Sequence, residues 1–283
     1  MAVTRSAYYR YRAGKKSKPT AAAQKMAQQV KDVFVENRRR YGTRRVSQEL
    51  QKQGQEIGRY RVRRLMQEQE LRAIQPKRYV PKTTNSDHQL ASPNLLKQEE
   101  NKEKEPKTVI IGDITYLPMA NGRFCYLASW QDKFTRRIIG WKVDKTMTEE
   151  LVIAALRKAI NSGSIANHAI LHTDRGSQYS SRNFRQLLKE NGVRQSMSAK
   201  GNCDDNAQAE SFFARYKSEL MENGKFENLE QAISETFGYI EGYYNRKRLH
   251  SGLDYQSPHQ FEKNYYKNLV KGELTEISVS CFT

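Results

Sequence analysis

The sequence has few cysteines and no long apolar run, and each absence excludes a class of protein. Its three cysteines, Cys125, Cys203 and Cys281, lie far apart and form no C-x-x-C pair, so neither a disulfide framework nor a zinc site is expected. The most apolar helical stretch, 151–160, is interrupted by an arginine and a lysine, and no N-terminal signal segment precedes it. We therefore expect a cytoplasmic, nucleoid-associated chain without membrane spans.

Negative charge is scarce in the first third of the chain. The whole sequence of 283 residues carries a formal net charge of +18. Within residues 1–86, 22 Lys and Arg stand against 6 Asp and Glu, so nearly all of the excess lies there. An anionic polymer is the natural partner of such a segment.

The positive segment has the pattern of a basic arm, 1–19, followed by a small helical domain, 20–74. Apolar residues recur at helical spacing in 20–40, 43–53 and 60–70, and Thr43 is a candidate N-cap. Three short helices with sharp turns suggest a helix-turn-helix; the alternative is a structural bundle with a solvated basic face. The expected phosphate contacts, called the five arginines below, are Arg44, Arg45, Arg61, Arg63 and Arg64.

Residues 75–107 contain four prolines and a charged run without apolar periodicity, which predicts a linker. A catalytic core is expected at 108–223, and a helical extension with a tyrosine stripe used for packing at 224–283. Strands are predicted at 108–118, 123–131, 136–143, 169–173 and 193–196, with a hairpin turn at Asn121-Gly122. Helices are predicted at 148–161, 180–191, around Glu210, at 229–245 and, briefly, after Pro258.

Three acidic residues occupy positions where burial would be costly without a partner or a metal. Asp113 interrupts the β-rich run 109–116, and Asp174 follows the apolar run 169–171. Glu210 lies within a helical pattern, and 35 residues separate it from Asp174. Such a set suits hard cations, which take oxygen ligands, and two-metal phosphoryl transfer. Asp132, by contrast, stands at a strand end where turn chemistry explains it.

Several motifs extend this pattern in one order along the chain: Gly112-Asp113-Ile114-Thr115-Tyr116, His172-Thr173-Asp174-Arg175-Gly176-Ser177-Gln178-Tyr179, Asp205-Asn206-Ala207, Glu210-Ser211-Phe212-Phe213 and Lys217. The sequence resembles the DDE transposases and retroviral-type integrases, and most closely the second reading frame of the IS3 insertion-sequence family. The resemblance implies an α/β fold, a ribonuclease H-like integrase core with a mixed five-stranded sheet and flanking helices, preceded by a small all-α helix-turn-helix domain.

The resemblance also implies roles for individual residues. Asp113, Asp174 and Glu210 match the catalytic acids that would bind two Mg²⁺ or Mn²⁺ ions. Lys217 would approach DNA, although a solvated helical lysine is the alternative. His172 is either structural or catalytic, and Asn206 either orients a metal-bound water or caps the helix.

Two positions depart from the family's usual pattern. Ile110 replaces a tryptophan with another buried β-former, and a change of little consequence is expected. Asp204 replaces an aromatic residue before Asp205-Asn206-Ala207 and adds a negative charge, which would weaken DNA binding or metal coordination.

The predicted function is metal-dependent strand cleavage at insertion-element ends, followed by strand transfer from the 3′-hydroxyl. The alternatives are a degenerate, DNA-binding repressor of the element and a structure-specific ribonuclease H-like nuclease. The expected partners are double-stranded DNA, with its terminal inverted repeats and target, further copies of the chain assembled on that DNA, and an upstream-frame protein or fusion.

Overall fold

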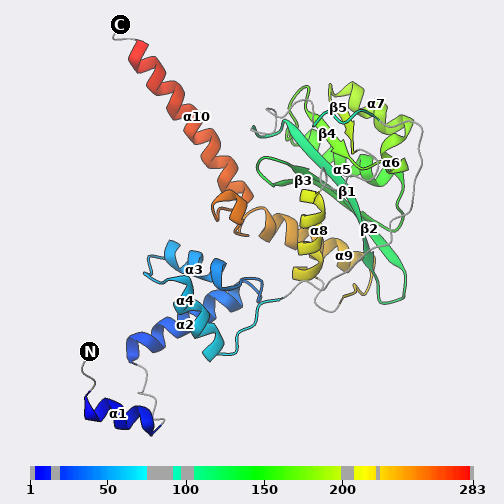
Figure 1. Ribbon diagram of the computed structural model, residues 1–283. Coiled ribbons are helices and arrows are strands. Elements are labelled where there is room, and N and C mark those ends of the chain that lie inside the picture. Colours follow the sequence, from blue (N-terminus) through cyan, green and yellow to red (C-terminus); the bar gives the residue numbers. More distant parts are fainter. Residues whose placement is uncertain are drawn as a thin grey trace. The chain divides into compact units, whose positions relative to one another are not determined.

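The computed structural model describes residues 4–13, 20–74, 92–96, 105–198, 207–220 and 224–280. The chain divides into two compact units, Met1–Ile74 and Gln75–Thr283 (Figure 1).

The first unit is helical. Its elements are α1 (Arg5–Arg12), α2 (Ala21–Glu36), α3 (Thr43–Lys52) and α4 (Arg59–Glu68). Thr20 caps α2, since its Oγ1 accepts a hydrogen bond of 3.2 Å from the Ala23 N–H. The prediction of Thr43 as an N-cap is wrong by one residue, because Gly42 holds that position without a side-chain bond.

One face of each helix α2, α3 and α4 forms the core of this unit. The spacing of the apolar residues predicts these inward faces, and the structure confirms them. The buried residues are Val30, Val33 and Phe34 of α2, Val46 and Leu50 of α3, and Val62, Leu65 and Met66 of α4.

The second unit is built on a mixed five-stranded sheet in the order β3-β2-β1-β4-β5. The strands are β1 (Val109–Pro118), β2 (Phe124–Asp132), β3 (Ile138–Asp144), β4 (Ile170–Thr173) and β5 (Arg194–Met197). β1, β2 and β3 pair antiparallel, whereas β4 runs parallel to both β1 and β5. Gly122 has a φ of +79° in the turn between β1 and β2, as the hairpin prediction required.

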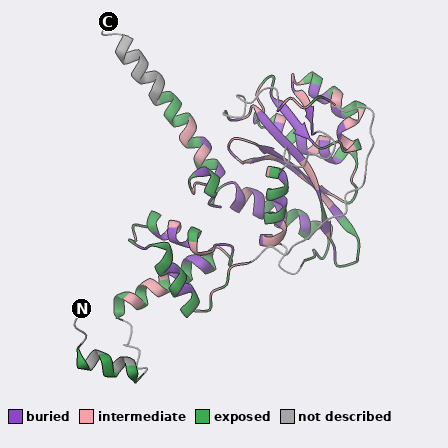
Figure 2. Ribbon diagram, in the orientation of Figure 1, coloured by how far each residue is buried: buried purple, intermediate pink, exposed green. Residues whose placement is uncertain are grey.

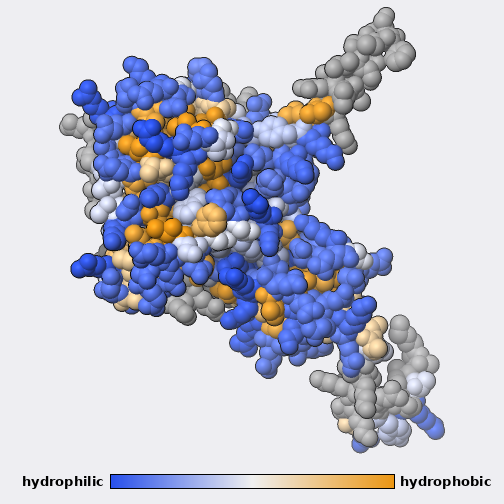
Figure 3. All heavy atoms as spheres, turned by 180° about the vertical axis from the view of Figure 1, so that it is seen from behind, coloured by the Kyte–Doolittle hydropathy of each residue, from blue (hydrophilic) through white to orange (hydrophobic). Residues whose placement is uncertain are grey.

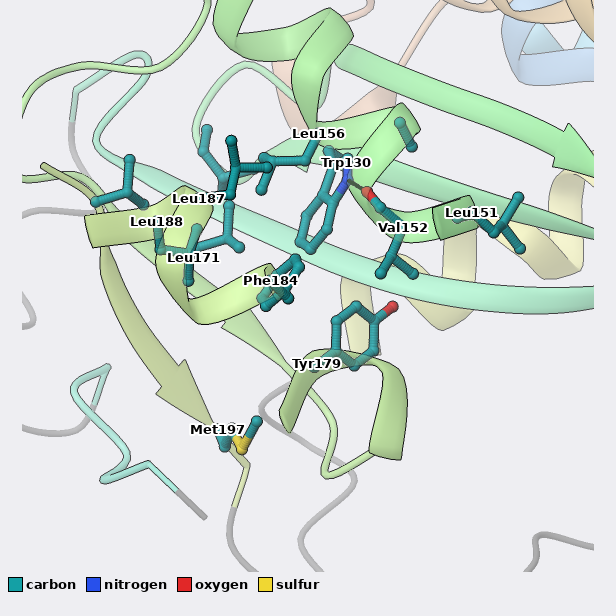
Figure 4. Packing of buried hydrophobic residues seen from close by; sticks show 14 residues of the cluster. Trp130, Leu151, Val152, Leu156, Leu171, Tyr179, Phe184, Leu187, Leu188 and Met197 are labelled. Carbon is teal, nitrogen blue, oxygen red and sulfur yellow. Dashed lines mark hydrogen bonds between the residues drawn. The ribbon is translucent and has the colours of Figure 1, made fainter. Parts of the chain in front are cut away.

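Three helices and the sheet residues facing them enclose the main core. They are α5 (Glu149–Asn161), α6 (Ser177–Ser180) and α7 (Arg182–Glu190). Trp130 of β2 is central: its ring stacks on Phe184 at 5.9 Å, and its Nε1 donates to the Val152 carbonyl at 3.3 Å (Figure 4).

Trp130 also explains the glycine in the middle of β1. A Cβ placed at Gly112, which pairs with Trp130, would lie 1.9 Å from the indole ring. Only glycine admits this close approach. Trp130 and Gly112 thus occupy one face of the sheet, and the next residue, Asp113, points to the other.

The opposite face of the sheet is covered by C-terminal helices. The elements there are α8 (Ala207–Leu220), α9 (Leu229–Phe237) and η3 (Gly238–Tyr244). Along the chain η4 (Ser251–Leu253) and α10 (Pro258–Ser280) follow, and α10 extends away from the sheet (Figure 1). Trp141 Nε1 of β3 donates to Glu241 Oε1 at 2.8 Å, and Gln131 Nε2 of β2 donates to the Tyr244 hydroxyl at 3.0 Å.

Two predicted C-terminal helices differ from the structure. The predicted helix 229–245 changes at Gly238 into a π-helix, in which Tyr239, Ile240, Tyr243 and Tyr244 are buried. The final helix is not short, since α10 has 23 residues. The buried tyrosines confirm that the stripe serves packing.

Residues 92–96, within the predicted linker, lie along β5. Ser92 Oγ donates to Gln195 Oε1 at 3.0 Å, and Leu95 N–H donates to Ser196 Oγ at 2.9 Å. Leu96 packs against Val109. This short segment therefore contributes to the core of the second unit.

Burial follows the sheet and the inner faces of its helices (Figure 2). The view from behind shows a largely hydrophilic face with hydrophobic patches (Figure 3). Exposed apolar side chains include Leu269 and Val270 of α10. Within the described residues, the helices lack the combination of length and apolar character needed to cross a bilayer.

Candidate active site

Asp113 and Asp174 lie at matching positions on neighbouring parallel strands. Ile111 of β1 pairs with His172 of β4. Two residues further along come Asp113, within β1, and Asp174, directly after β4. Because residues two apart in a strand share a face, this register brings both carboxylates to one side of the sheet.

Helix α8 carries the third acid and a lysine to the same place. The helix packs inward through Ala209, Phe212, Phe213 and Tyr216. Glu210 is exposed, and Lys217, two turns later, is half-buried. Both side chains act electrostatically on Asp113.

Asp113 is the most perturbed acid of the group. Burial and the negative charges of Asp174 and Glu210 raise its pKa to about 8, against the opposing effects of the Ile114 N–H, which donates at 2.8 Å, and of Lys217. Burial in turn lowers the pKa of Lys217, while Asp113 acts in the opposite direction. The charges of Asp174, Glu210 and Lys217 thus all act on Asp113.

The loop after β4 holds Asp174 by its backbone. The Gly176 N–H donates to Asp174 Oδ1 at 3.0 Å. Desolvation of the carboxyl raises the pKa of Asp174, and this hydrogen bond partly offsets the rise. A Cβ on Gly176 would lie 3.1 Å from Asp174 Oδ1 and 3.3 Å from Tyr179 Cδ2. The carboxylate and the tyrosine ring therefore flank one glycine.

His172 is buried beneath the acids. Its Nδ1 lies 2.9 Å from Ser196 Oγ and its Nε2 lies 3.0 Å from Ser198 Oγ. Both ring nitrogens are thus engaged by the segment that begins with β5. This arrangement favours the structural alternative, in which His172 ties β4 to β5.

Two further polar residues have contrasting roles. Asp132 accepts from the N–H groups of Lys107 at 2.7 Å, Phe134 at 2.9 Å and Thr135 at 3.1 Å, which confirms its turn role. Tyr179 is a residue that sequence reasoning passed over. Desolvation and the charges of Asp174 and Asp113 raise the pKa of its buried phenol well above the ordinary value. Its place in the motif that contains Asp174 was the only signal.

The predicted metal site is not assembled as a complete cluster among the residues that the structure describes. There, no three His, Cys, Asp or Glu side chains gather closely enough to hold an ion. The donor chemistry nevertheless fits a hard cation, since all three side chains are carboxylates. Burial and the negative charges of Asp174 and Glu210 raise the Asp113 pKa, and a bound cation would favour the charged carboxylate. Asn206 and Asp204 lie outside the described residues.

The five arginines lie on α3 and α4 of the first unit. Arg44, Arg61, Arg63 and Arg64 are exposed. Arg45 is half-buried, and its guanidinium lies 5.6 Å from the centre of the Tyr41 ring. Arg64 also pairs with Glu68 at 3.6 Å. Four of the five guanidinium groups are therefore presented to solvent.

Three segments of the chain match known protein families. Residues 21–79 match the family described as HTH-like domain. Residues 103–203 and 191–258 each match a family described as Integrase core domain. The matches follow the two units and include Asp113, Asp174, Glu210 and Lys217.

Similar proteins span nearly the same length. The transposase for insertion sequence element IS904 of Lactococcus lactis is 40% identical, over 87% of this chain and 97% of its own. Transposase InsF for insertion sequence IS3A of Escherichia coli is 38% identical, over 84% and 81%. The HTLV-2 integrase catalytic core domain in complex with magnesium aligns with a TM-score of 0.42 at 16% identity, covering 56% of this chain and 97% of that one.

Proposed function

The chain belongs to the IS3 family of insertion-sequence transposases, and from this we propose that it cleaves DNA at the ends of an insertion element and joins the freed 3′-hydroxyl to a target. The observation that carries the proposal is the raised pKa of Asp113, which reaches about 8 because the carboxyl is buried and because Asp174 and Glu210 add negative charge. Acids packed against one another in this way are a mark of a functional site.

Asp113, Asp174 and Glu210 would hold two divalent ions, Mg²⁺ or Mn²⁺. When bound, such ions stabilise the attacking and leaving oxygens of an in-line displacement at phosphorus. The two strand-borne acids are set by the sheet register, and Glu210 comes from a helix packed on β1. Three carboxylates on three separate elements can thus converge without a flexible loop carrying all of them.

Lys217 would bind the DNA backbone beside the acids. Lys217 is half-buried, and its amine interacts electrostatically with Asp113. The positive charge of this amine can offset the negative charge that a phosphate group brings. The five arginines would contact backbone phosphates through the first unit, which fixes position along DNA without reading bases. Terminal inverted repeats and target DNA are the proposed substrates.

The test compares DNA binding with chemistry in one preparation. We expect Asp113→Asn, Asp174→Asn and Glu210→Gln each to abolish strand cleavage and joining while leaving gel-shift binding to element ends intact. Asp144→Asn is a matched control, because Asp144 ends β3 and its Oδ1 only accepts from the Lys145 N–H at 2.7 Å. Full activity in any acid variant contradicts that residue's role. Binding by the unaltered chain without any cleavage would instead support the repressor alternative.

A further inference from the structure

Helix α4 of the first unit presents a broad surface to solvent. Apart from its three core residues, every residue of α4 is exposed. In α3, by contrast, Arg44, Gln51 and Lys52 are the exposed residues, and the other seven are buried or half-buried. A helix-turn-helix places its second helix in the major groove of DNA. In the α3–α4 pair, the second helix is also the one with the open surface.

Three side chains lie on the side of α4 that is opposite its core residues. They are Tyr60, Arg64 and Gln67, which follow one another by four and then three residues and therefore share one face. We call them the α4 ridge. Arg61 and Arg63 stand on its two flanks, because each is turned by roughly a quarter of the helix circumference from the ridge. Helices that read DNA in the major groove use side chains with this spacing.

The two uncharged members of the α4 ridge have no role inside the unit. Tyr60 is 84% exposed, and neither Tyr60 nor Gln67 forms a side-chain hydrogen bond with the residues that the structure describes. Gln69, two residues after Gln67, differs, since its Nε2 donates to the Ala27 carbonyl at 2.9 Å. The fold thus uses the amide of Gln69 and leaves the amide of Gln67 for an external partner.

The charges around the α4 ridge indicate what this partner is. Arg61 and Arg63 are exposed on its two flanks. The one acid of α4, Glu68, is its last residue and pairs with Arg64 at 3.6 Å. A strip of polar side chains between two guanidinium groups matches a groove bounded by two phosphate backbones. Duplex DNA has this arrangement of charge.

We propose that α4 enters the major groove at the element ends and that Tyr60 and Gln67 read bases there, in addition to the phosphate contacts of the five arginines. An amide can donate to N7 and N6 partners as adenine requires, accepting from the N6 amino group and donating to N7. The ring of Tyr60 offers an apolar contact to the methyl group of thymine. Seven residues of helix span about 10 Å, so the two base pairs lie about three steps apart. This inference rests on the proposed function, because it concerns the same DNA ends.

The test removes single groups from both molecules. The full chain is bound in gel shifts to duplexes of the terminal inverted repeat, in which one thymine at a time is replaced by uracil or one adenine by 7-deazaadenine. Uracil lacks the methyl group, and 7-deazaadenine lacks the N7 acceptor. For the unaltered chain we expect a uracil position that weakens binding about fourfold and a 7-deazaadenine position that weakens it about fivefold. The uracil effect should disappear in Tyr60→Ala, and the 7-deazaadenine effect should disappear in Gln67→Ala.

Two controls separate base reading from other effects. Gln28→Ala is the matched glutamine variant, since Gln28 is exposed on α2 and its Nε2 donates to Asp32 at 2.7 Å; it should leave both base effects unchanged. Arg61→Ala should weaken binding to every duplex alike and reduce the slope of log K against log salt by about 0.9. A base effect that persists in its own variant overturns the inference. Equal binding of the unaltered chain to the inverted repeat and to a shuffled duplex also overturns it.

The failure of the proposed function looks different. In that case the unaltered chain does not cleave element ends in the presence of Mg²⁺, or Asp113→Asn cleaves them equally well. If the unaltered chain cleaves the ends and its binding ignores every single-base change, the proposed function stands and the base-reading role of α4 is wrong.

Discussion

Replacing Glu219 by Gln should destabilise the second unit by breaking a buried ion pair behind the site. Glu219 stands on α8, nine residues after Glu210, and accepts from Arg248 through NH2 at 2.6 Å and Nε at 2.9 Å. The Tyr239 hydroxyl donates to the same carboxylate at 2.9 Å. The pair therefore joins the helix that carries the third acid to the C-terminal extension.

The burial of both partners sets the size of the effect. The side chains of Arg248 and Glu219 are only 1% and 8% exposed. Removing one charge of such a pair costs about 3–5 kcal/mol, since the other charge stays buried. Arg248 also lies 5.7 Å from the centre of the Tyr244 ring, and this contact remains in the variant. We therefore expect the free energy of unfolding to fall by about 3 kcal/mol, the lower end of this range.

Urea unfolding followed by tryptophan fluorescence measures this loss in the second unit alone, because both tryptophans, Trp130 and Trp141, belong to it. A loss of about 3 kcal/mol shifts the midpoint by about 1 M urea for a slope near 3 kcal/mol/M. Glu262→Gln is the control. Its pair with Arg137, at 2.7 Å, has a partner that is 32% exposed, so the loss should be smaller.

A midpoint for Glu219→Gln within about 0.3 M of the unaltered chain, equivalent to less than about 1 kcal/mol, would refute the reasoning. It would mean that Arg248 finds other compensation once the carboxylate is neutral. If Glu219→Gln and Glu262→Gln lost the same free energy of unfolding, burial would not set the size of the loss.

Three further predictions concern charge and assembly. The folded-state pKa of Asp113 is raised from 3.8 to about 8, so the metal-free fold binds a proton that the unfolded chain releases, and stability falls as pH rises between these values. Asp113→Asn should therefore unfold at higher urea than the unaltered chain at pH 8, and much less so at pH 4; the same difference at both pH values contradicts the pKa argument. Fragment 1–86 should bind duplex DNA with a slope of log K against log salt of about −4 to −5, since each of the five arginines contributes about −0.9; a flat response in a salt titration would indicate a protein-binding bundle. The isolated chain should scatter light as a monomer or weak associate and transpose in cells only with its upstream frame, because its sequence shows no sustained apolar heptads; efficient transposition by the chain alone rules this out.

The sequence by itself determined the order of the main secondary-structure elements and which acids are candidates for the site. Alternation and helical spacing are local patterns, so the three helices around Val46 and the strands around Asp113 could be predicted from neighbouring residues. Turn chemistry is local as well, which is why the roles of Asp132 and Gly122 could be inferred. The motifs that contain Asp113, Asp174 and Glu210 indicated the family through residue types in order.

Only the tertiary structure decided how distant residues meet. The Glu219–Arg248 pair joins residues 29 positions apart, and Ser92 meets Gln195 across 103 positions; neither leaves a periodic trace in the sequence. The π-helix at 238–244 likewise leaves no trace in the sequence, because its four buried residues have a spacing that an α-helix would also place on one face. The raised pKa of Asp113 has the same origin. Burial and electrostatics depend on which groups the fold brings together, and a sequence specifies those neighbours only through the whole fold.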